Sequence, residues 1–304
     1  MRAFLKRLLG RDLLQAQQQQ LALLNSRTAR LESALGALLA AHARTAPSMA
    51  AAEFKMFSQW GDDGIIQFLV ANVPLSVPRF IEFGVEDYAE SNTRFLLLHN
   101  QWQGLVMDGS AAHVAHIQRD PISWQYGLQS KCAFITAENI NTLISEAGFA
   151  GPVGLLHIDI DGNDYWVWQA LTACAPQLVI MEFNHLFGAD RPITIPYSAD
   201  FVRTRAHYSG LYAGAGLAAL HHLAIQKGYK LIGINRAGNN AYFLQQSLAP
   251  QLPALSPQQA FHPAHFVESR DTSGQLSFLS AEKSLALLAG LPVVNVVTGN
   301  QETL

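Results

Sequence analysis

Residues 154–168 read GLLHIDIDGNDYWVW, an apolar run that ends in three aspartates, Asp159, Asp161 and Asp164. A run such as LLHIDI is typical of a strand that is covered on both faces in a parallel sheet. Ligands of open α/β sheets bind just beyond the carboxyl ends of such strands, so these aspartates stand where a site is expected. The alternative is a turn over residues 161–163 with Asp164 as a helix cap, because short polar residues favour both. We expect each interpretation to hold for some of these residues.

The composition is that of a globular protein. The chain has 304 residues, 49% of them hydrophobic, which is ample for a sizeable core. It lacks an uncharged apolar run of about 18 residues, and its start lacks the apolar core of a signal peptide. We therefore expect a soluble, cytoplasmic protein, at most peripheral at the inner face of a membrane. Cys132 and Cys174 fit neither a metal spacing nor a disulfide framework, so we predict that both are buried apolar residues.

Charge is distributed unevenly along the chain. Residues 1–45 carry seven lysines and arginines against two acidic residues, whereas the remainder carries 13 basic and 21 acidic residues. An acidic body argues against a nucleic-acid partner, because phosphates require a basic surface. We therefore predict no nucleic acid among the partners and interpret residues 1–45 separately.

The leader, residues 1–45, has a heptad pattern. Leucine fills six of the eight positions in two interleaved series, which are Leu14, Leu21, Thr28 and Leu35, and Gln17, Leu24, Leu31 and Leu38. This spacing predicts a helix of about 30 residues that pairs with copies of itself, as a homo-oligomer, or with a partner. The basic and apolar residues of 1–14 are compatible with a solvated terminus, an anionic membrane surface or a membrane-associated partner. Pro47 stops the helix, and residues 46–52 are predicted to be a linker.

From residue 53 onward the chain alternates strands and helices. One predicted strand ends in Glu82 and Gly84, and the next ends in Asp108, 24 residues after that glycine. Five strand and helix units in succession predict a parallel sheet with right-handed crossovers. Residues 230–244 are two apolar runs joined by Arg-Ala-Gly-Asn, which predicts a hairpin at the sheet edge. The expected fold class is α/β, a Rossmann-like seven-stranded sheet, mostly parallel with an antiparallel terminal hairpin, preceded by the coiled-coil helix.

Four motifs resemble those of the FkbM-type S-adenosylmethionine-dependent methyltransferases. They are SQWGDDGI at 58–65, FIEFGVEDYAESNT at 80–93, GLVMDGS at 104–110 and LLHIDIDGNDYWVW at 155–168. The resemblance implies a methyltransferase domain over residues 53–246. It does not reach residues 247–304, which we interpret from their prolines as a covering segment. The chain departs from the family after Gly84, where the cofactor loop lacks the usual further glycines.

A methyl donor with a sulfonium group, an amino acid end and a ribose requires a glycine turn and carboxylates. Glu82, Gly84 and Asp108 supply these groups, with Asp108 placed for the ribose hydroxyls. The resemblance adds Gln59 and Asp63 as cofactor-binding residues, although a helix-start role is the alternative for Asp63. A NAD-dependent Rossmann oxidoreductase is the rival, but its G-x-G-x-x-G fingerprint is absent.

Methyl transfer to oxygen requires a base or a metal ion to activate the acceptor hydroxyl. Oxygen ligands at the ends of the fourth and fifth strands suit a hard cation such as Mg²⁺, and they would be Asp159, Asp161, Glu182 and Asn184. Without a metal the general base would be Asp161, His157 or His185, of which His157 lies inside a strand and is more typical of a core histidine. The candidate catalytic residues are therefore Asp159, Asp161 and His185.

The acceptor is predicted least directly. Residues 185–216 are long and loop-like, which is typical of a lid or an acceptor wall. Three arginines would hold an anionic acceptor and three tyrosines would stack on a sugar ring, namely Arg191, Arg203, Arg205, Tyr197, Tyr208 and Tyr212. The resemblance favours a sugar or glycan-type acceptor, as in surface polysaccharide synthesis. A catalytically silent methyltransferase-like scaffold protein remains the other alternative.

Overall fold

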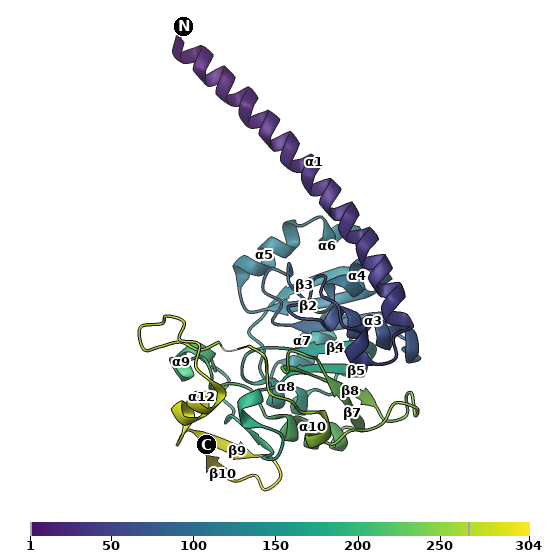
Figure 1. The fold of residues 1–304 in the computed structure, drawn as a ribbon, viewed down its shortest axis with the longest axis vertical. Coiled ribbons are helices and arrows are strands. Elements are labelled where there is room, and N and C mark those ends of the chain that lie inside the picture. Colours follow the sequence, from purple (N-terminus) through teal and green to yellow (C-terminus); the bar gives the residue numbers. More distant parts are fainter. Residues whose placement is uncertain (1, 267) are drawn as a thin grey trace.

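The computed structural model describes residues 2–266 and 268–304, with side chains from residue 13 onward. A seven-stranded sheet forms its centre, in the order β3-β2-β1-β4-β5-β8-β7 (Figure 1). The strands are β1 (Arg79–Phe83), β2 (Gln103–Asp108), β3 (Leu128–Cys132), β4 (Gly151–Ile158), β5 (Cys174–Glu182), β7 (Tyr229–Ile234) and β8 (Asn240–Gln245).

The direction of the strands confirms the predicted fold class. Strands β1 to β5 pair in parallel, whereas β8 pairs antiparallel with both β5 and β7. The order reverses between β1 and β4, because the chain first adds strands on one side and then on the other. Such a switch point opens a crevice at the carboxyl ends of the strands, which is where ligands of open α/β sheets bind.

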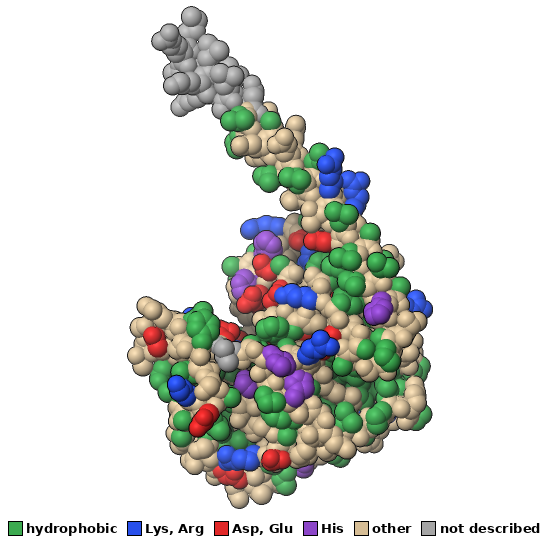
Figure 2. All heavy atoms as spheres, in the orientation of Figure 1, with side chains coloured by type: hydrophobic (Ala, Val, Ile, Leu, Met, Phe, Trp, Pro, Cys, Tyr) green, Lys and Arg blue, Asp and Glu red, His purple; other side chains and the backbone are tan. Residues whose placement is uncertain are grey.

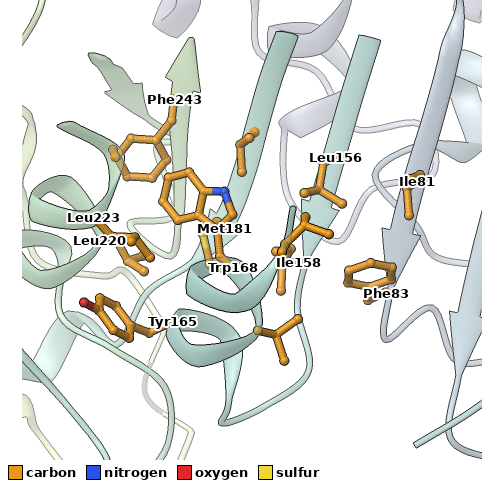
Figure 3. Packing of buried hydrophobic residues seen from close by; sticks show 14 of the residues in the cluster. Ile81, Phe83, Leu156, Ile158, Tyr165, Trp168, Met181, Leu220, Leu223 and Phe243 are labelled. Atoms are coloured by element: carbon orange, nitrogen blue, oxygen red, sulfur yellow. The ribbon is translucent and has the colours of Figure 1, made fainter. Parts of the chain in front are cut away.

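Helices cover both faces of the sheet. One face packs against α7 (Ile140–Glu146), α8 (Asp164–Ala170) and α10 (Leu217–Gln226). Figure 3 shows its centre, where the Trp168 ring lies 5.3 Å from that of Phe243 above Met181. The other face packs against the end of α1 and against α2 (Met49–Ala52), α3 (Asp62–Asn72), α4 (Arg94–Asn100), α5 (Ala111–Arg119) and α6 (Ile122–Gln125). Burial on both faces explains why the strands read as apolar runs instead of alternating ones.

The leader forms the single long helix α1 (Arg2–Arg44), which projects away from the body in Figure 1. Its end packs on the body, and the segment predicted as a linker, 46–52, contains the one-turn helix α2. The Ser48 side chain caps α2 by accepting a hydrogen bond from the amide of Ala51. Across residues 2–266 and 268–304, no helix combines the length and the apolarity needed to cross a bilayer.

The last residues do more than cover the body. A second sheet of order β10-β9-β6 joins β6 (Ile193–Thr194) of the predicted lid to β9 (Pro292–Asn295) and β10 (Gln301–Thr303). The lid also contains η1 (His185–Phe187) and α9 (Arg203–Ala206), and the last segment contains α11 (Pro257–Ala260) and α12 (Ala281–Leu288). A separate apolar cluster that includes Phe187, Ile193 and Leu288 holds these parts together. The lid is therefore a packed wall. Cys174 is buried as predicted, but Cys132, at the end of the outer strand β3, is exposed.

Candidate functional site

Polar side chains gather at one end of the sheet, on the face that α3 and α4 cover. Successive side chains of a strand point to opposite faces. At each strand end, the polar residue points to this face, and its apolar neighbours in the strand point to the opposite face. The polar residues are Asp108 on β2, Glu82 on β1, His157 on β4, Glu182 on β5 and Asn240 on β8. Five adjacent strands thus direct polar groups into one crevice.

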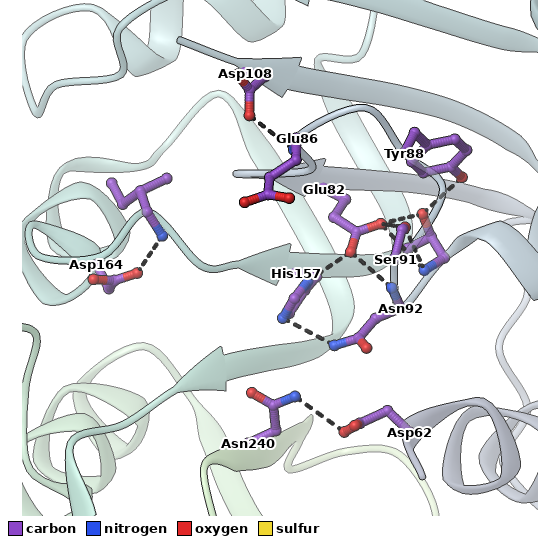
Figure 4. Close-up of polar contacts among 12 residues, drawn as sticks. Asp62, Glu82, Glu86, Tyr88, Ser91, Asn92, Asp108, His157, Asp164 and Asn240 are labelled. Atoms are coloured by element: carbon purple, nitrogen blue, oxygen red, sulfur yellow. Dashed lines mark hydrogen bonds and ion pairs between the residues drawn. The ribbon is translucent and has the colours of Figure 1, made fainter. Parts of the chain in front are cut away.

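Glu82 is buried and its carboxylate is saturated with hydrogen bonds (Figure 4). It accepts hydrogen bonds from the Ser91 hydroxyl at 2.5 Å, from the backbone amides of Asn92 and Thr93 at 3.0 and 3.1 Å, and from the Thr93 hydroxyl. His157 Nδ1 lies 2.9 Å from the Oε1 atom of Glu82. Burial alone would raise the pKa of Glu82, but the contacts from His157, Ser91 and Thr93 outweigh it and lower the pKa. Glu82 therefore shapes the loop that precedes α4.

His157 supports Glu82 and is not placed as a base. Its Nδ1 faces Glu82, and its Nε2 lies 3.1 Å from the side-chain amide of Asn92. With Nδ1 donating, Nε2 accepts from that amide, so both ring nitrogens are used. The structure thus decides the alternative that the sequence left open, in favour of a buried core histidine.

Gly84 begins the predicted cofactor loop and has no substitute there. Its φ is +71°, and a Cβ atom at this position would lie 1.7 Å from the carbonyl oxygen of Asp159. The glycines expected after it are missing, but Glu86 and Tyr88 adopt left-handed backbone with φ of 48° and 64°. The amide of Glu86 donates to Asp108 at 2.8 Å, which holds this unusual conformation. The loop therefore keeps a tight path without further glycines.

Asp108 accepts two backbone hydrogen bonds and also lines a cavity. One oxygen accepts from Glu86, and the other accepts from the amide of Ser110 at 2.7 Å in a local turn. The residue also lines a cavity of about 510 Å³ that extends over the strand ends. Gln59, Gly84 and the exposed ring of Phe134 line the same cavity, which we call the donor cavity.

Three carboxylates meet at the far end of the donor cavity. Asp159, Asp161 and Glu182 each offer an oxygen within 4.8 Å of the others. Burial, and then the charge of the neighbouring carboxylates, raises the pKa of Asp159 well above its ordinary value and that of Glu182 to about 7. Arg203 pairs with Asp161 and supplies a positive charge beside this acid cluster. The two acids after β4 and the one at the end of β5 are the residues that the sequence selected.

Asp161 reaches this position because of the turn that follows β4. Its φ is 57°, in the left-handed region. The side chain of Asp164 stabilises the turn by accepting hydrogen bonds from the amides of Ile160 and Gly162, both at 2.8 Å. Burial raises the pKa of Asp164 to about 6. The structure therefore divides the three aspartates, with Asp159 and Asp161 in the cluster and Asp164 holding the turn. The predicted helix cap at Asp164 is wrong, because α8 begins at Asp164 itself and Asn163 occupies the N-cap position.

A second cavity of about 340 Å³ begins at the acid cluster, and we call it the acceptor cavity. Asp161, Glu182 and Arg203 line both cavities, so the two meet at the cluster. The acceptor cavity contains His185, whose pKa burial lowers. Its wall also includes Trp60 and Phe266, whose rings stack with centroids 5.5 Å apart. His185 thus lines the same cavity as Asp161 and Glu182, and its burial favours the neutral imidazole.

Two residues predicted for the site have other roles. One oxygen of Asp63 accepts hydrogen bonds from the amides of residues 56, 57 and 58 and from the Ser58 hydroxyl, and the residue lines neither cavity. Asn184, predicted as a metal ligand, donates to the carbonyls of Leu211 and Ala213, and its oxygen accepts from the amide of Leu186. Asp63 therefore organises the loop before α3, and Asn184 fastens the lid. We leave Asp63 out of the proposed site. Asn184 lines the wall of the acceptor cavity, and we leave it out of the metal ligands only.

The predicted lid contributes only one of its three arginines to the cluster. Arg191 pairs with Glu302 at 3.1 Å, and Arg205 donates to the carbonyl of Asp200. The three tyrosines proposed to stack on a sugar ring line neither the donor nor the acceptor cavity. Tyr197, for example, donates to Glu138 at 2.5 Å. Arg203 remains, but it neutralises Asp161 instead of facing an anionic acceptor.

Several residues of the two cavities were not predicted from the sequence. Asn163 and Asn240 are buried in the donor cavity wall, and each has a side-chain oxygen without a hydrogen-bond partner in the described part of the chain. The register places Asn240 directly opposite Glu182 on the neighbouring strand. For Asn240, the only sequence signal was the polar pair Asn239-Asn240 at the start of an apolar strand. Trp60 and Phe266 gave no signal, because they are 206 residues apart.

Comparisons with known proteins concern the fold. The sequence matches no family model and no curated protein. Among solved structures, the CurJ carbon methyltransferase is 10% identical at a TM-score of 0.40, with 62% of this chain and 56% of that chain covered. The N-terminal domain of EvdMO1 with SAH bound is 11% identical at a TM-score of 0.39, with 62% of this chain and 80% of that chain covered. An O-methyltransferase family protein from Burkholderia thailandensis is 10% identical at a TM-score of 0.37, with 61% of this chain and 59% of that chain covered. The chain thus spans less than two thirds of the first and third of these. Likenesses this distant carry no argument about function.

Proposed function

We propose that the chain is an S-adenosylmethionine-dependent O-methyltransferase. The observation that carries the proposal is the meeting of the two cavities at the acid cluster, with Asp108 at the opposite end of the donor cavity. A methyl donor and an acceptor could then approach each other at one place, as an in-line transfer requires.

The donor cavity matches the chemistry of S-adenosylmethionine. Asp108 would receive the ribose hydroxyls, and the exposed ring of Phe134 would pack on the adenine. The cationic sulfonium would lie toward the carboxylates, where its charge is favoured. The unpartnered oxygens of Asn163 and Asn240 are suited to accept hydrogen bonds from the donor's ammonium group.

The loop between β1 and α4 argues against NAD as the ligand of the donor cavity. In dinucleotide folds the pyrophosphate binds the amides at the start of the first helix. Here the amides of Asn92 and Thr93, which precede α4, already donate to Glu82. A pyrophosphate would therefore meet a buried carboxylate, and the amides of Asn92 and Thr93 are already engaged. A cationic donor experiences no such repulsion.

A divalent cation such as Mg²⁺ fits the acid cluster. Hard cations bind carboxylate oxygens at about 2.0–2.6 Å, so ligands on opposite sides of one ion lie about 4–5 Å apart. Asp159, Asp161 and Glu182 offer oxygens within 4.8 Å of one another. Burial and then the neighbouring carboxylates raise the pKa values of Asp159 and Glu182 despite the nearby Arg203, and a cation would offset this cost. When bound, such an ion would polarise an acceptor hydroxyl and lower its pKa. His185, neutral in the acceptor cavity, would take the hydroxyl proton.

The acceptor that we propose is a sugar or a glycan-type molecule, as in surface polysaccharide synthesis. Stacked aromatic rings and carboxylates are suited to a hydroxyl-rich ring, with the apolar ring face on Trp60 or Phe266. An anionic acceptor is disfavoured, because four acidic residues line the cavity against one arginine, Arg203. The acidic residues are Asp161, Asp164, Glu182 and Glu268.

Titration calorimetry tests the proposal. The chain should bind S-adenosylmethionine and not NAD, and Mg²⁺ should bind separately. Glu182→Ala should retain donor binding and lose methyl transfer to monosaccharide and oligosaccharide acceptors, whereas Asp108→Ala should lose donor binding. NAD binding alone would overturn the proposal in favour of an oxidoreductase. Donor binding without transfer to any acceptor would instead favour a silent scaffold.

A further inference from the structure

Helix α1 packs on the body through one narrow face. Gly36, Ala40 and Ala43 are buried, at a spacing of four and three residues that places them on one side of the helix. A Cβ atom at Gly36 would lie 2.6 Å from the ring of Phe95 on α4, so the small residue permits this close contact. The contacts of α1 with α2, α3 and α4 all use this end of the helix.

The leucines of the heptad face another direction. At about 100° per residue, the three leucines nearest the buried residues, Leu31, Leu35 and Leu38, lie roughly 105–165° around the helix from the centre of the buried face. Figure 2 shows apolar side chains along the projecting helix. The exposed fractions are 55% for Leu14, 58% for Leu21, 56% for Leu24, 71% for Leu31, 51% for Leu35 and 68% for Leu38. We call these six residues the leucine seam. It stays uncovered even at its end, where α1 lies on the body.

A long helix with an uncovered seam lacks the interaction that usually stabilises helices. Most helical stability in proteins comes from packing of an apolar face. The seam spans about 36 Å from Leu14 to Leu38 at about 1.5 Å per residue, which is more than three heptads. That length and spacing match a coiled-coil partner with the same period.

We propose that α1 pairs in parallel with α1 of a second copy of this chain. With Leu14 and Leu24 as the first leucines of the two seam series, Arg27 and Glu32 flank the seam on opposite sides. In a parallel pair each flanking residue meets the one five positions later on the other helix. Arg27 of one copy therefore faces Glu32 of the other, twice in the dimer.

The antiparallel arrangement lacks this complementarity. In an antiparallel pair, each flanking position meets the same flanking position of the other helix. When the two seams are aligned at their centres, Arg27 therefore faces Arg27 of the second copy. A parallel pair also places both bodies at the same end of the coil. The body of the same chain leaves the seam exposed, including Leu35 and Leu38 at the end that packs on it, so the seam is accessible for pairing. The inference does not depend on the proposed function.

Light scattering with size-exclusion chromatography of the full chain tests the pairing. The wild type should have the mass of a dimer at micromolar concentration, and Leu24→Glu with Leu31→Glu should have that of a monomer. Leu23→Glu is the matched control, because Leu23 is 49% exposed but lies outside the seam. The control should remain a dimer. A monomeric or trimeric wild type, or an equal response of the control, would overturn the proposal.

Cross-linking and charge exchange test the orientation. In a Cys132→Ser background, which removes the exposed cysteine, Leu31→Cys should form a disulfide between chains, since residue 31 meets itself only in a parallel pair. Arg27→Glu should weaken the dimer roughly fivefold for two exposed charge pairs, and adding Glu32→Arg should restore it. Absence of the cross-link, or no rescue, would refute the parallel register.

A membrane is the competing occupant of the seam, and vesicles of phosphatidylglycerol and phosphatidylcholine distinguish it. A dimer with a buried seam should bind these vesicles no better than the Leu24→Glu, Leu31→Glu variant. A monomeric wild type that binds them, with binding lost in that variant, would assign the leucines to lipid and overturn the pairing.

Discussion

Glu182→Gln should stabilise the folded chain while it abolishes activity. Glu182 lies in the acid cluster beside Asp159 and Asp161, where burial and then the neighbouring charges oppose its ionisation. Glutamine keeps the size of the side chain and removes the charge. Sites built for chemistry often store electrostatic strain of this kind, so stability and function change in opposite directions.

The magnitude follows from the pKa. That of Glu182 rises from its ordinary value of 4.5 to about 7. At about 1.36 kcal/mol for each pKa unit, ionisation of this carboxyl at pH 8 destabilises the folded chain by about 3 kcal/mol. The side chain reaches solvent through the cavity and lies near Arg203, which screens part of this effect. We therefore expect the variant to gain about 1–3 kcal/mol in the free energy of unfolding.

Urea denaturation across a pH series measures the effect. Well below pH 4.5, Glu182 is protonated in both the folded and the unfolded chain, so the two proteins should be equally stable. The unfolded chain loses this proton near pH 4.5, whereas the folded chain keeps it to about pH 7. The wild type should therefore lose stability relative to the variant across this window, with a constant difference above it.

Two comparisons make the result decisive. Glu146→Gln is the control, because Glu146 is 62% exposed, pairs with Lys131 and should change stability by less than about 0.5 kcal/mol. Mg²⁺ at pH 8 should raise the melting temperature of the wild type more than that of Glu182→Gln. If the variant proved less stable than the wild type at pH 8, Arg203 would outweigh burial and the reasoning would be wrong.

Three further predictions concern the donor cavity. Gly84→Ala should lower the free energy of unfolding by at least about 2 kcal/mol in urea denaturation, because its Cβ would meet the Asp159 carbonyl at a positive φ; an unchanged midpoint would contradict the close approach. Asp108→Asn should weaken S-adenosylmethionine binding in calorimetry while a circular dichroism spectrum stays native; unchanged affinity would remove Asp108 from the ribose site. Phe134→Ala should weaken the same binding by about 1–2 kcal/mol without affecting stability, since the ring is exposed, and a fall in melting temperature would argue for a structural role instead.

The acidic motifs show which features of the site could be predicted from the sequence and which could not. Asp63 and Asp159 both stand in acidic motifs of the same resemblance, yet only Asp159 joins the cluster. The carboxylate of Asp63 turns into the amides of residues 56–58, which fold back over the start of α3. Which local amides reach a carboxylate depends on the path of the preceding loop, and no spacing in the sequence encodes that path.

The same limit applies to Glu82 and Asn184. Glu82 was correctly predicted to end a strand at the crevice, but its oxygens are occupied by a histidine 75 residues away and by the turn before α4. Asn184 follows the fifth strand as predicted, but two carbonyls of the lid compete for its side chain. In both cases the residue was found correctly and its role depended on partners distant in sequence.

The sequence by itself determined the order of strands and helices, the polar residue at each strand end and the heptad of the leader, because all three depend on local periodicity along one chain. Only the tertiary structure decided which of these residues meet. It brought Glu182 opposite Asn240, joined two cavities at the acid cluster and left the leucine seam exposed. The physical reason is that such contacts join residues far apart in the chain, and strand order and helix packing, which bury both faces of the sheet, place them together.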